Sequence, residues 1–307
     1  MVIKFAIKDF LQDRLYKNLS PNTVESYRLV LDMFHKYCVS QEIVNTEEIT
    51  QNVVKAFLIY LQNEKHNNPT SRNTKLRTLK TFFNYLEEIE VYTAKQNPIK
   101  KVSYAKEDIN IQPFTEYHIN QMLGYLRRSK QKERTIYNYR DYMICVSLLG
   151  LGIRLGEMVN LKWADIDFKS GTCFILGKKR ELSSVPITDK LLKELAEYRI
   201  FCEHHFKTLG AYVFPTDQNT QLSPDAVKSL FKRLKTAMGF KDDIRVSAHT
   251  FRITFAVRCI QNGIDAFTLQ RLLRHQTLDM TNRYVRMFGT ALKTQNDKFN
   301  PLNDINL

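Results

Sequence analysis

The sequence predicts a mainly α-helical protein with one small β-hairpin or sheet, divided into two domains. Three observations support this fold class. Apolar residues between Val24 and Cys38 recur at spacings of three and four, which is the period of a helix that buries one face. Ser20-Pro21 is a typical helix start, because serine caps free amides and proline fits the first turn. Two short strand-like runs flank a turn that begins at Gly177.

Residues 1–105 are expected to form an all-helical first domain. After the helix that begins at Pro21, the next candidate helix covers Val53–Asn63, and a third runs from Thr70 to about Ile89. The approach to this third helix carries several cations and no acid. Cations at a helix start oppose the helix dipole, and nearby phosphates would relieve this. A solvated basic face would give the same pattern.

A linker is expected at residues 106–112, after Asn97-Pro98 interrupts the helical pattern. The second domain then covers residues 113–287. Residues 288–307 are polar with a few apolar residues, and we expect them to form a C-terminal tail.

Within the second domain, the sequence predicts helices on both sides of the hairpin. Gly150 and Gly152 are expected to end a buried helix, and residues 127–134 are expected to form a basic loop. The expected elements are the helices Glu116–Arg128 and Asn138–Leu149, a helix from near Arg154, the strands Thr172–Leu176 and Glu181–Ile187, and the helices Asp189–Phe201, Pro224–Met238, Ser247–Gln261 and Asp265–Leu273.

The charge balance points to a polyanionic partner. The 307 residues include 46 Lys and Arg against 32 Asp and Glu, a net charge of +14, which favours nucleic acid first and an anionic membrane surface second. Five cysteines occur without a C-x-x-C pair, so the sequence predicts neither a zinc site nor a disulfide framework, and a reducing cytoplasm is expected. The N-terminus is not expected to be a signal peptide. The longest mostly apolar run, Tyr142 to Ile153, has 12 residues and is too short to span a bilayer.

One set of residue types fits the cleavage of a DNA phosphodiester without a metal. Attack at phosphorus builds negative charge on the non-bridging oxygens, and the planar fork of arginine matches two of them. Arg154 and Arg252 are the candidate pair. Tyr284 is a candidate nucleophile, because its ester is stable and its phenolate leaves more easily than a sugar alkoxide. A hairpin lysine can protonate the departing sugar oxygen, and His249 and His275 can stabilise the charge or accept the tyrosine proton.

The order and spacing of these residues resemble the tyrosine recombinase (phage integrase) family. That family has an arginine box with Arg and Glu three apart, a hairpin lysine, a His-x-x-Arg box, a Leu-x-His element, and a tyrosine nine residues after that histidine. The matching residues here are Arg154 and Glu157, Lys178 and Lys179, His249 and Arg252, Leu273 and His275, and Tyr284. The resemblance covers nearly the whole chain.

The resemblance implies a role for each residue. Tyr284 would form a 3′-phosphotyrosyl link and free a 5′-hydroxyl. Arg154 and Arg252 would hold the scissile phosphate with His249 and His275. Lys178 would be the general acid, with Lys179 as the alternative, and Glu157 would hold its neighbours in place. No cofactor, no metal and no ATP are implied.

The resemblance also implies an architecture and partners. A helical core-binding (SAM-like) domain and a mixed α/β catalytic domain would form a C-shaped clamp around double-stranded DNA. Four protomers would synapse two sites as a homotetramer and exchange strands through a Holliday junction, with the tail docked on a neighbouring protomer. The two-domain layout resembles Xer-like recombinases and transposon or conjugative-element integrases. Mobile-element integration or excision and dimer resolution both remain open, as does an accessory directionality factor. A cytoplasmic, nucleoid-associated protein is expected.

Several cations are expected to contact DNA. Arg274 stands where the family usually has glycine, and its added charge can reach a phosphate. The expected DNA-binding residues are Lys65, Arg72, Lys75, Arg77, Lys80, Lys100, Lys101, Lys179, Arg180 and Arg274.

Three other classes of protein share part of this pattern. A type IB topoisomerase uses related chemistry without exchanging partners. A non-catalytic DNA-binding or architectural protein would need only the basic surface, and a basic structural module would need no DNA at all. Covalent capture of DNA separates the enzymes from the binding proteins, and strand exchange separates a recombinase from a topoisomerase.

Overall fold

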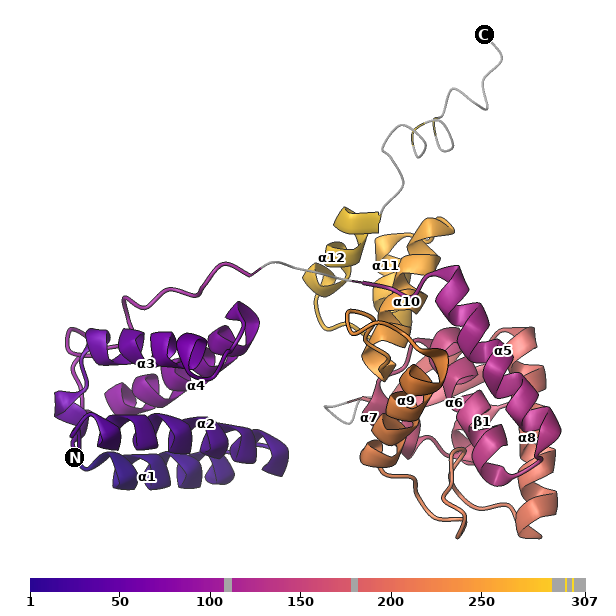
Figure 1. Cartoon of the computed structure of the whole chain (residues 1–307), viewed down its shortest axis with the longest axis horizontal. Coiled ribbons are helices and arrows are strands. Elements are labelled where there is room, and N and C mark those ends of the chain that lie inside the picture. Colours follow the sequence, from indigo (N-terminus) through magenta and orange to yellow (C-terminus); the bar gives the residue numbers. More distant parts are fainter. Residues whose placement is uncertain (108–111, 178–181, 289–295, 297–299, 301–307) are drawn as a thin grey trace. The chain divides into compact units, whose positions relative to one another are not determined.

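The computed structural model describes residues 1–107, 112–177, 182–288, 296 and 300. The chain divides into two compact units, Met1–Asn110 and Ile111–Leu307 (Figure 1). Each unit has its own hydrophobic core.

The first unit is a bundle of four helices whose starts are capped as the sequence indicates. Ser20 accepts a hydrogen bond from the Thr23 amide at 3.2 Å, and Asn68 accepts one from the Ser71 amide at 2.8 Å. These side chains satisfy amides that have no partner inside the helix. The helices are α1 (Ile3–Tyr16), α2 (Pro21–Ser40), α3 (Gln51–Asn63) and α4 (Pro69–Glu88), with a 3₁₀ turn at Thr46–Glu48.

The core of the first unit is rich in phenylalanine. Phe34 and Phe57 meet edge to face with ring centroids 5.1 Å apart, a favoured aromatic geometry. The segment after α4 also belongs to this core, because Ile99 and Val102 are buried in it. Asn73 then holds the chain at Ala105 through two hydrogen bonds of 2.8 Å. The segment after Asn97-Pro98 is therefore irregular but packed and hydrogen-bonded up to Ala105.

The second unit is built around α6. This helix buries most of its length between α5, α8 and α10. The second unit's helices are α5 (Glu116–Lys132), α6 (Ile136–Leu151), α7 (Leu155–Asn160), α8 (Asp189–Phe206), α9 (Pro224–Met238), α10 (Ala248–Gln261), α11 (Ala266–Leu273) and α12 (Leu278–Phe288).

Two local predictions for this unit were wrong. Gly150 lies inside α6, where a Cβ would come within 2.8 Å of Leu191, so this glycine permits close packing of α6 on α8 and does not end the helix. Only Gly152 ends it, in the left-handed conformation with φ 56°. The predicted basic loop at residues 127–134 is mostly helical, because α5 continues to Lys132.

The expected hairpin is part of a three-stranded antiparallel sheet in the order β1-β2-β3. The strands are β1 (Ile166–Asp167), β2 (Thr172–Leu176) and β3 (Leu182–Pro186). Cys173 opposes Val185, and both side chains are buried, whereas Leu176 and Leu182 oppose each other on the exposed face. The strand β1 was not predicted, because its two residues are too few to show a period.

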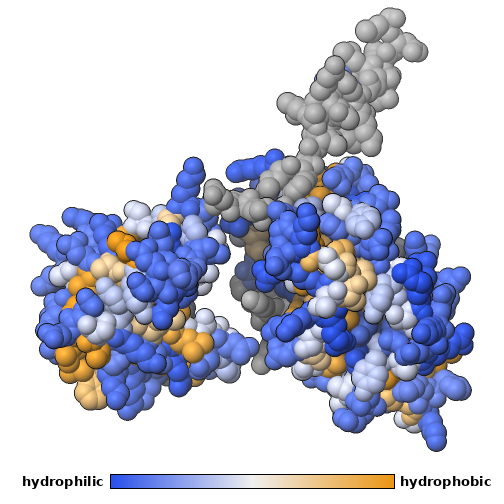
Figure 2. Space-filling view, viewed as in Figure 1, coloured by the Kyte–Doolittle hydropathy of each residue, from blue (hydrophilic) through white to orange (hydrophobic). Residues whose placement is uncertain are grey.

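A second, smaller core in this unit joins α10, α11 and α12. It includes Val257, Leu269, Leu273 and Tyr284. The helix α12 was also absent from the prediction. In the face shown in Figure 2, the surface is mostly hydrophilic, with small apolar areas. Within the described ranges, no helix is long and apolar enough to cross a membrane.

Replacing Gly152 with alanine should destabilise the second unit more than the same change at Gly239. Both glycines have φ near +60°, but a Cβ at Gly152 would lie 2.4 Å from Phe255, whereas a Cβ at Gly239 meets nothing within 4 Å. We expect about 1–2 kcal/mol of backbone strain at either site and about 1–3 kcal/mol more at Gly152 from overpacking. Urea unfolding monitored on both variants measures the difference. Equal losses would contradict the assigned packing of Phe255 on this turn.

Candidate active site

Three of the four residues predicted to hold a phosphate line one cavity in the second unit. This cavity has a volume of about 280 Å³, and Arg154, His249 and Arg252 line it. Arg245 and Lys228, which were not predicted from the sequence, line it as well. Arg245 stands four residues before His249, which would place the two on one face of a helix. Because Arg245 precedes the start of α10 at Ala248, this spacing does not explain its position at the cavity. The cavity therefore gathers five basic side chains, which suits an anionic ligand.

Arg252 is fixed deep in the unit by two backbone carbonyls. Its side chain is 5% exposed, one terminal nitrogen donates to Gly152 O at 2.6 Å, and the other donates to Leu273 O. Burial and the charges of Arg154 and Arg274 lower the pKa of Arg252 to about 10. The guanidinium stays charged at neutral pH, and three of its five N–H groups have no protein partner among the described residues.

Arg154 occupies the cap position of α7 and is held by two partners. One terminal nitrogen lies 2.7 Å from Glu157 Oε1, and the other donates to Arg274 O at 3.1 Å. The Glu157 carboxylate also accepts from the Arg154 amide at 2.8 Å. The side chain of Arg154 is still 32% exposed, so part of its guanidinium faces the cavity.

Arg274 lies in a buried ion pair. Its guanidinium is 2.8 Å from Glu157 Oε2, and both side chains are less than 10% exposed. The backbone at Arg274 is left-handed, with φ 53°, at the end of α11. Burial raises the pKa of Glu157, but Arg274 and the hydrogen bonds from Arg154 outweigh it, so the pKa lies below the usual value. Arg274, which was expected to reach a DNA phosphate, is thus paired with the Glu157 carboxylate inside the unit.

His275 and Tyr284 form a pair beside the two arginines. Their rings are nearly parallel, 19° apart, with centroids separated by 6.3 Å. Each side chain is 8% exposed. Burial raises the pKa of Tyr284, partly offset by the charges of Arg252 and Arg283. The Tyr284 hydroxyl has no protein partner in the described ranges, and it is not among their buried unpartnered atoms, so it keeps access to solvent.

Thr281 contacts the edge of the His275 ring. Its hydroxyl lies 2.8 Å from Nδ1, and the threonine is fully buried. Burial and the charges of Arg252, Arg154 and Arg274 lower the pKa of His275 to about 4. This histidine is therefore neutral at pH 7. Thr281 could not be predicted from the sequence, because nothing in the local pattern identifies the partner of a buried threonine.

His249 differs from His275 in its exposure. It projects from the first turn of α10, which Ser247 caps by accepting from the Thr250 amide at 3.2 Å. Its side chain is exposed, although surrounding protein atoms and the charges of Arg245 and Arg252 lower its pKa. An exposed, neutral imidazole at the rim of the cavity is suited to accept a proton. The hairpin residues Lys178, Lys179 and Arg180 lie outside the described residues.

The remaining expected DNA contacts lie on the first unit, several of them with local partners. Lys65 and Lys80 sit over the rings of Tyr60 and Tyr104, with distances to the ring centroids of 5.7 and 4.6 Å. Arg72 donates to Gln62 at 2.5 Å. Lys75 donates to Asn67 at 2.6 Å and Lys100 pairs with Glu87 at 3.1 Å, while Arg77 is exposed.

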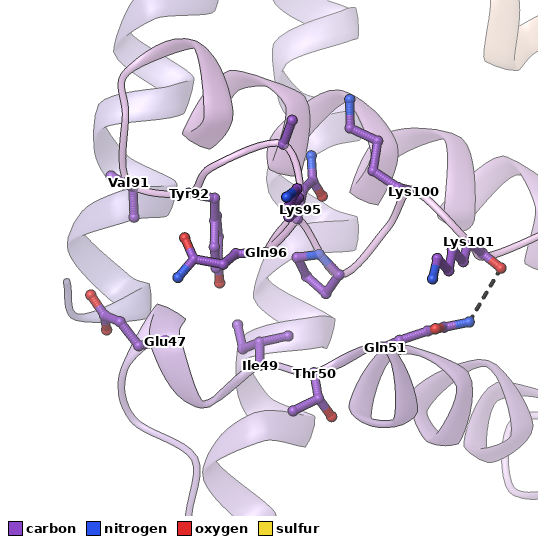
Figure 3. A pocket seen from close by; sticks show the side chains of 13 residues that line it. Glu47, Ile49, Thr50, Gln51, Val91, Tyr92, Lys95, Gln96, Lys100 and Lys101 are labelled. Carbon is purple, nitrogen blue, oxygen red and sulfur yellow. Dashed lines mark hydrogen bonds between the residues drawn. The ribbon is translucent and has the colours of Figure 1, made fainter.

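A second cavity lies in the first unit, and none of the predicted catalytic residues lines it. It has a volume of about 800 Å³, and Lys95, Lys100 and Lys101 border it (Figure 3). Gln51 donates to Lys101 O at 3.2 Å on one side of it. Its size exceeds that of the arginine-lined cavity, but it holds no cluster of nucleophile, acid and paired arginines. In the part of the chain that the structure describes, no group of three His, Cys, Asp or Glu is arranged to hold a metal ion.

Comparison with known proteins identifies the class to which this fold and cavity belong. Residues 113–289 match the phage integrase family, and residues 7–88 match the N-terminal SAM-like domain of phage integrases. The first match alone covers more than half of the chain, so the chain belongs to the phage integrase family. It is a tyrosine recombinase, and the predictions of family, enzyme class, recombinase function and mainly helical fold with a small sheet are confirmed.

Curated relatives and solved structures resemble the whole chain. Tyrosine recombinase XerC of Chlorobaculum parvum is 26% identical over 311 residues, covering 93% of this chain and 90% of the relative. XerC of Oceanobacillus iheyensis is 27% identical over 299 residues, covering 95% and 94%. The Tn1549 transposon integrase in complex with transposon right-end DNA has a TM-score of 0.76 at 16% identity, covering 99% of this chain and 100% of that one. A lambda integrase tetramer bound to a Holliday junction has a TM-score of 0.72 at 16% identity, covering 92% and 77%.

Stability should fall between pH 6.5 and pH 4 because of His275. Its pKa of about 4 in the folded protein lies below the ordinary value of 6.5, so the unfolded chain binds more protons in this interval and folding loses up to roughly 3 kcal/mol as the pH falls. The facing charges are Arg252, Arg154 and Arg274. Urea unfolding at several pH values should show a smaller loss in His275→Gln than in the wild type. Parallel curves for the two proteins would contradict the assignment.

Glu157→Gln should destabilise the second unit strongly. The change leaves the buried Arg274 guanidinium without its carboxylate, and breaking a buried pair in this way costs about 3–5 kcal/mol. Glu203→Gln is the matched control, because Glu203 pairs with Arg199 at 3.1 Å and both side chains are more than 40% exposed; its loss should stay below about 1 kcal/mol. Chemical denaturation compares the two. A Glu157 variant as stable as the Glu203 variant would show that the ion pair does not hold the turn.

Proposed function

We propose that this protein is a site-specific recombinase that cuts and rejoins double-stranded DNA through a covalent bond to Tyr284. The observation that carries the proposal is the convergence of Arg154, His249 and Arg252 on one cavity. Arg154 and Arg252 also donate to the carbonyls of Arg274 and Leu273, directly before His275, whose ring pairs with that of Tyr284. A scissile phosphate in this cavity would be held by two guanidinium groups that retain free N–H donors. The nucleophile needed for transfer stands on the neighbouring helix.

The proposed reaction balances without an external energy source. The Tyr284 oxygen attacks phosphorus and loses its proton to His249, the exposed and neutral base. The bond between phosphorus and the 5′ oxygen breaks, leaving a 3′-phosphotyrosyl ester, and Lys178 protonates the departing 5′ oxygen, with Lys179 as the alternative donor. Arg154 and Arg252 stabilise the charge that develops on the non-bridging oxygens. A 5′-hydroxyl from a second strand reverses these steps and completes the exchange.

We further assign DNA contact to both units. Residues 1–105 act as the helical core-binding domain, through Lys65, Arg72, Lys75, Arg77, Lys80, Lys100 and Lys101. Residues 113–287 form the catalytic domain, joined by the linker 106–112. The side chains over aromatic rings are preorganised cations, which supports phosphate contact by this surface.

The assembly we propose is a homotetramer on two synapsed sites that passes through a Holliday junction. Support comes from the fold likeness to a lambda integrase tetramer bound to a Holliday junction. In this assembly residues 288–307 dock on a neighbouring protomer. The transposon integrase bound to transposon-end DNA supports integration or excision of a mobile element, and the XerC relatives support dimer resolution. An accessory factor would set direction, and the protein would act in the cytoplasm on the nucleoid.

Tyr284→Phe should abolish covalent capture of DNA. Wild-type protein is incubated with duplexes from the DNA flanking its gene, each nicked beside the cleavage site so that a short 5′-hydroxyl strand is lost and the intermediate is trapped. A denaturing gel should show a slow-migrating adduct with the wild type and none with Tyr284→Phe, because the phenylalanine has no hydroxyl to form the ester.

Tyr117→Phe is the matched control for that experiment. Tyr117 lies in the same unit, is 65% exposed and has no part in the cavity, so its variant should form the adduct as the wild type does. Adduct formation by Tyr284→Phe would place the nucleophile elsewhere. Specific binding without any adduct in the wild type would favour a DNA-binding protein without catalysis.

A further inference from the structure

We infer that Thr281 is a positioning residue that fixes the proton of neutral His275 on Nε2, so that this histidine donates a hydrogen bond to the reacting phosphate. The inference rests on the proposed function for the identity of the ligand. The juxtaposition itself is a property of the described residues: a fully buried threonine hydroxyl 2.8 Å from His275 Nδ1.

The backbone of His275 is held by two hydrogen bonds with Gln270. Its amide donates to Gln270 O at 3.1 Å, and its carbonyl accepts from the Gln270 side chain at 3.2 Å. With Nδ1 paired to Thr281, only Nε2 remains for a ligand. Nε2 has no protein partner among the described residues and is not one of their buried unpartnered atoms, so it faces accessible space.

Helix geometry places Thr281 and Tyr284 on the same face of α12. They are three residues apart, and side chains at that spacing are neighbours. Tyr284 stacks on the face of the His275 ring, while Thr281 meets its edge. One helix therefore carries both the proposed nucleophile and the group that sets the state of the adjacent histidine.

The direction of the Thr281–His275 bond follows from the partners of the hydroxyl. Four helical threonines, Thr74, Thr81, Thr236 and Thr254, donate to the carbonyl four residues earlier. Thr281 makes no such bond in the described structure, and Nδ1 is its single side-chain partner. If Nδ1 carried the proton, the threonine O–H would be a buried donor without an acceptor, which is unfavourable.

The favoured arrangement is therefore a Thr281 hydroxyl that donates to Nδ1. In a neutral imidazole, a hydrogen-bond acceptor at Nδ1 leaves the proton on Nε2. An Nε2–H group is a donor, and a donor stabilises charge that develops on phosphate oxygens. His275 then acts as a neutral hydrogen-bond donor and leaves proton acceptance from Tyr284 to His249.

The test compares Thr281→Val with Thr281→Ser in the full-length protein. Valine has nearly the same shape and keeps the branched side chain, but it lacks the hydroxyl. We expect adduct formation on the nicked substrate to slow by roughly tenfold to a hundredfold in Thr281→Val, the effect typical of losing such a supporting contact. Thr281→Ser keeps the hydroxyl and should stay within a few-fold of the wild type.

A double-mutant cycle separates positioning from simple structural support. In a His275→Gln background the side-chain amide donates regardless of position 281, so adding Thr281→Val should bring no further loss. An equal additional loss in that background, or wild-type rates in Thr281→Val alone, would overturn the inference.

A spectroscopic measurement tests the inference without any DNA. Nitrogen-15 NMR of the histidine ring distinguishes the two neutral tautomers. We expect the Nε2–H form for His275 in the wild type and a shift toward the Nδ1–H form in Thr281→Val. An Nδ1–H form in the wild type would overturn the inference even if adduct formation upheld the recombinase function. A missing adduct with the Nε2–H form present would instead count against the recombinase function alone.

Discussion

The site depends on one left-handed turn at the end of α11. Arg274 has φ 53° there, and this conformation aims two consecutive carbonyls at the two arginines of the cavity: Leu273 O accepts from Arg252 and Arg274 O accepts from Arg154. The next residue is His275. A non-glycine residue in this conformation costs about 1–2 kcal/mol, and the buried pair with Glu157 offsets that strain by anchoring the same residue. This single turn at the end of α11 thus connects to the start of α7 through Arg154 and to α10 through Arg252.

The charge distribution around this turn leaves the cavity prepared for an anion. Three guanidinium groups surround one buried carboxylate, that of Glu157, so the cluster stays positive. The pKa of Arg252 is lowered by its burial and by its two arginine neighbours, which is a further effect of the excess positive charge. A phosphate in the cavity would supply the missing negative charge in a low-dielectric setting, where it is worth more than at the surface. The geometry that holds the arginines therefore also makes phosphate binding favourable.

Much of the fold could be read from local sequence, whereas the contacts that support the site could not. The stripe from Val24 to Cys38 and the cap at Ser20 specify α2 because both signals lie within the helix itself. The roles of Arg274 and Thr281 depend on partners that local patterns do not reveal: the Arg274–Glu157 pair joins residues 117 apart in sequence, and Thr281 meets a histidine before its own helix begins. Arg274 accordingly looked like a free surface cation, and Gly150 looked like a helix end because its contact with α8 is tertiary. The family pattern located the proposed reacting residues, since it records their order without needing these contacts.

The small core shared by α10, α11 and α12 holds Tyr284 and Thr281 in place together, because both lie on α12. Tyr284 belongs to that core, and Thr281 lies on the same face of the same helix. Any displacement of α12 that frees the tyrosine must also withdraw the threonine hydroxyl from His275. The histidine would then lose the contact that selects its tautomer at the moment the nucleophile leaves. The docking of Tyr284 and the contact of Thr281 with His275 therefore occur together. A protomer with α12 displaced would lack both the nucleophile and the contact that keeps the His275 proton on Nε2.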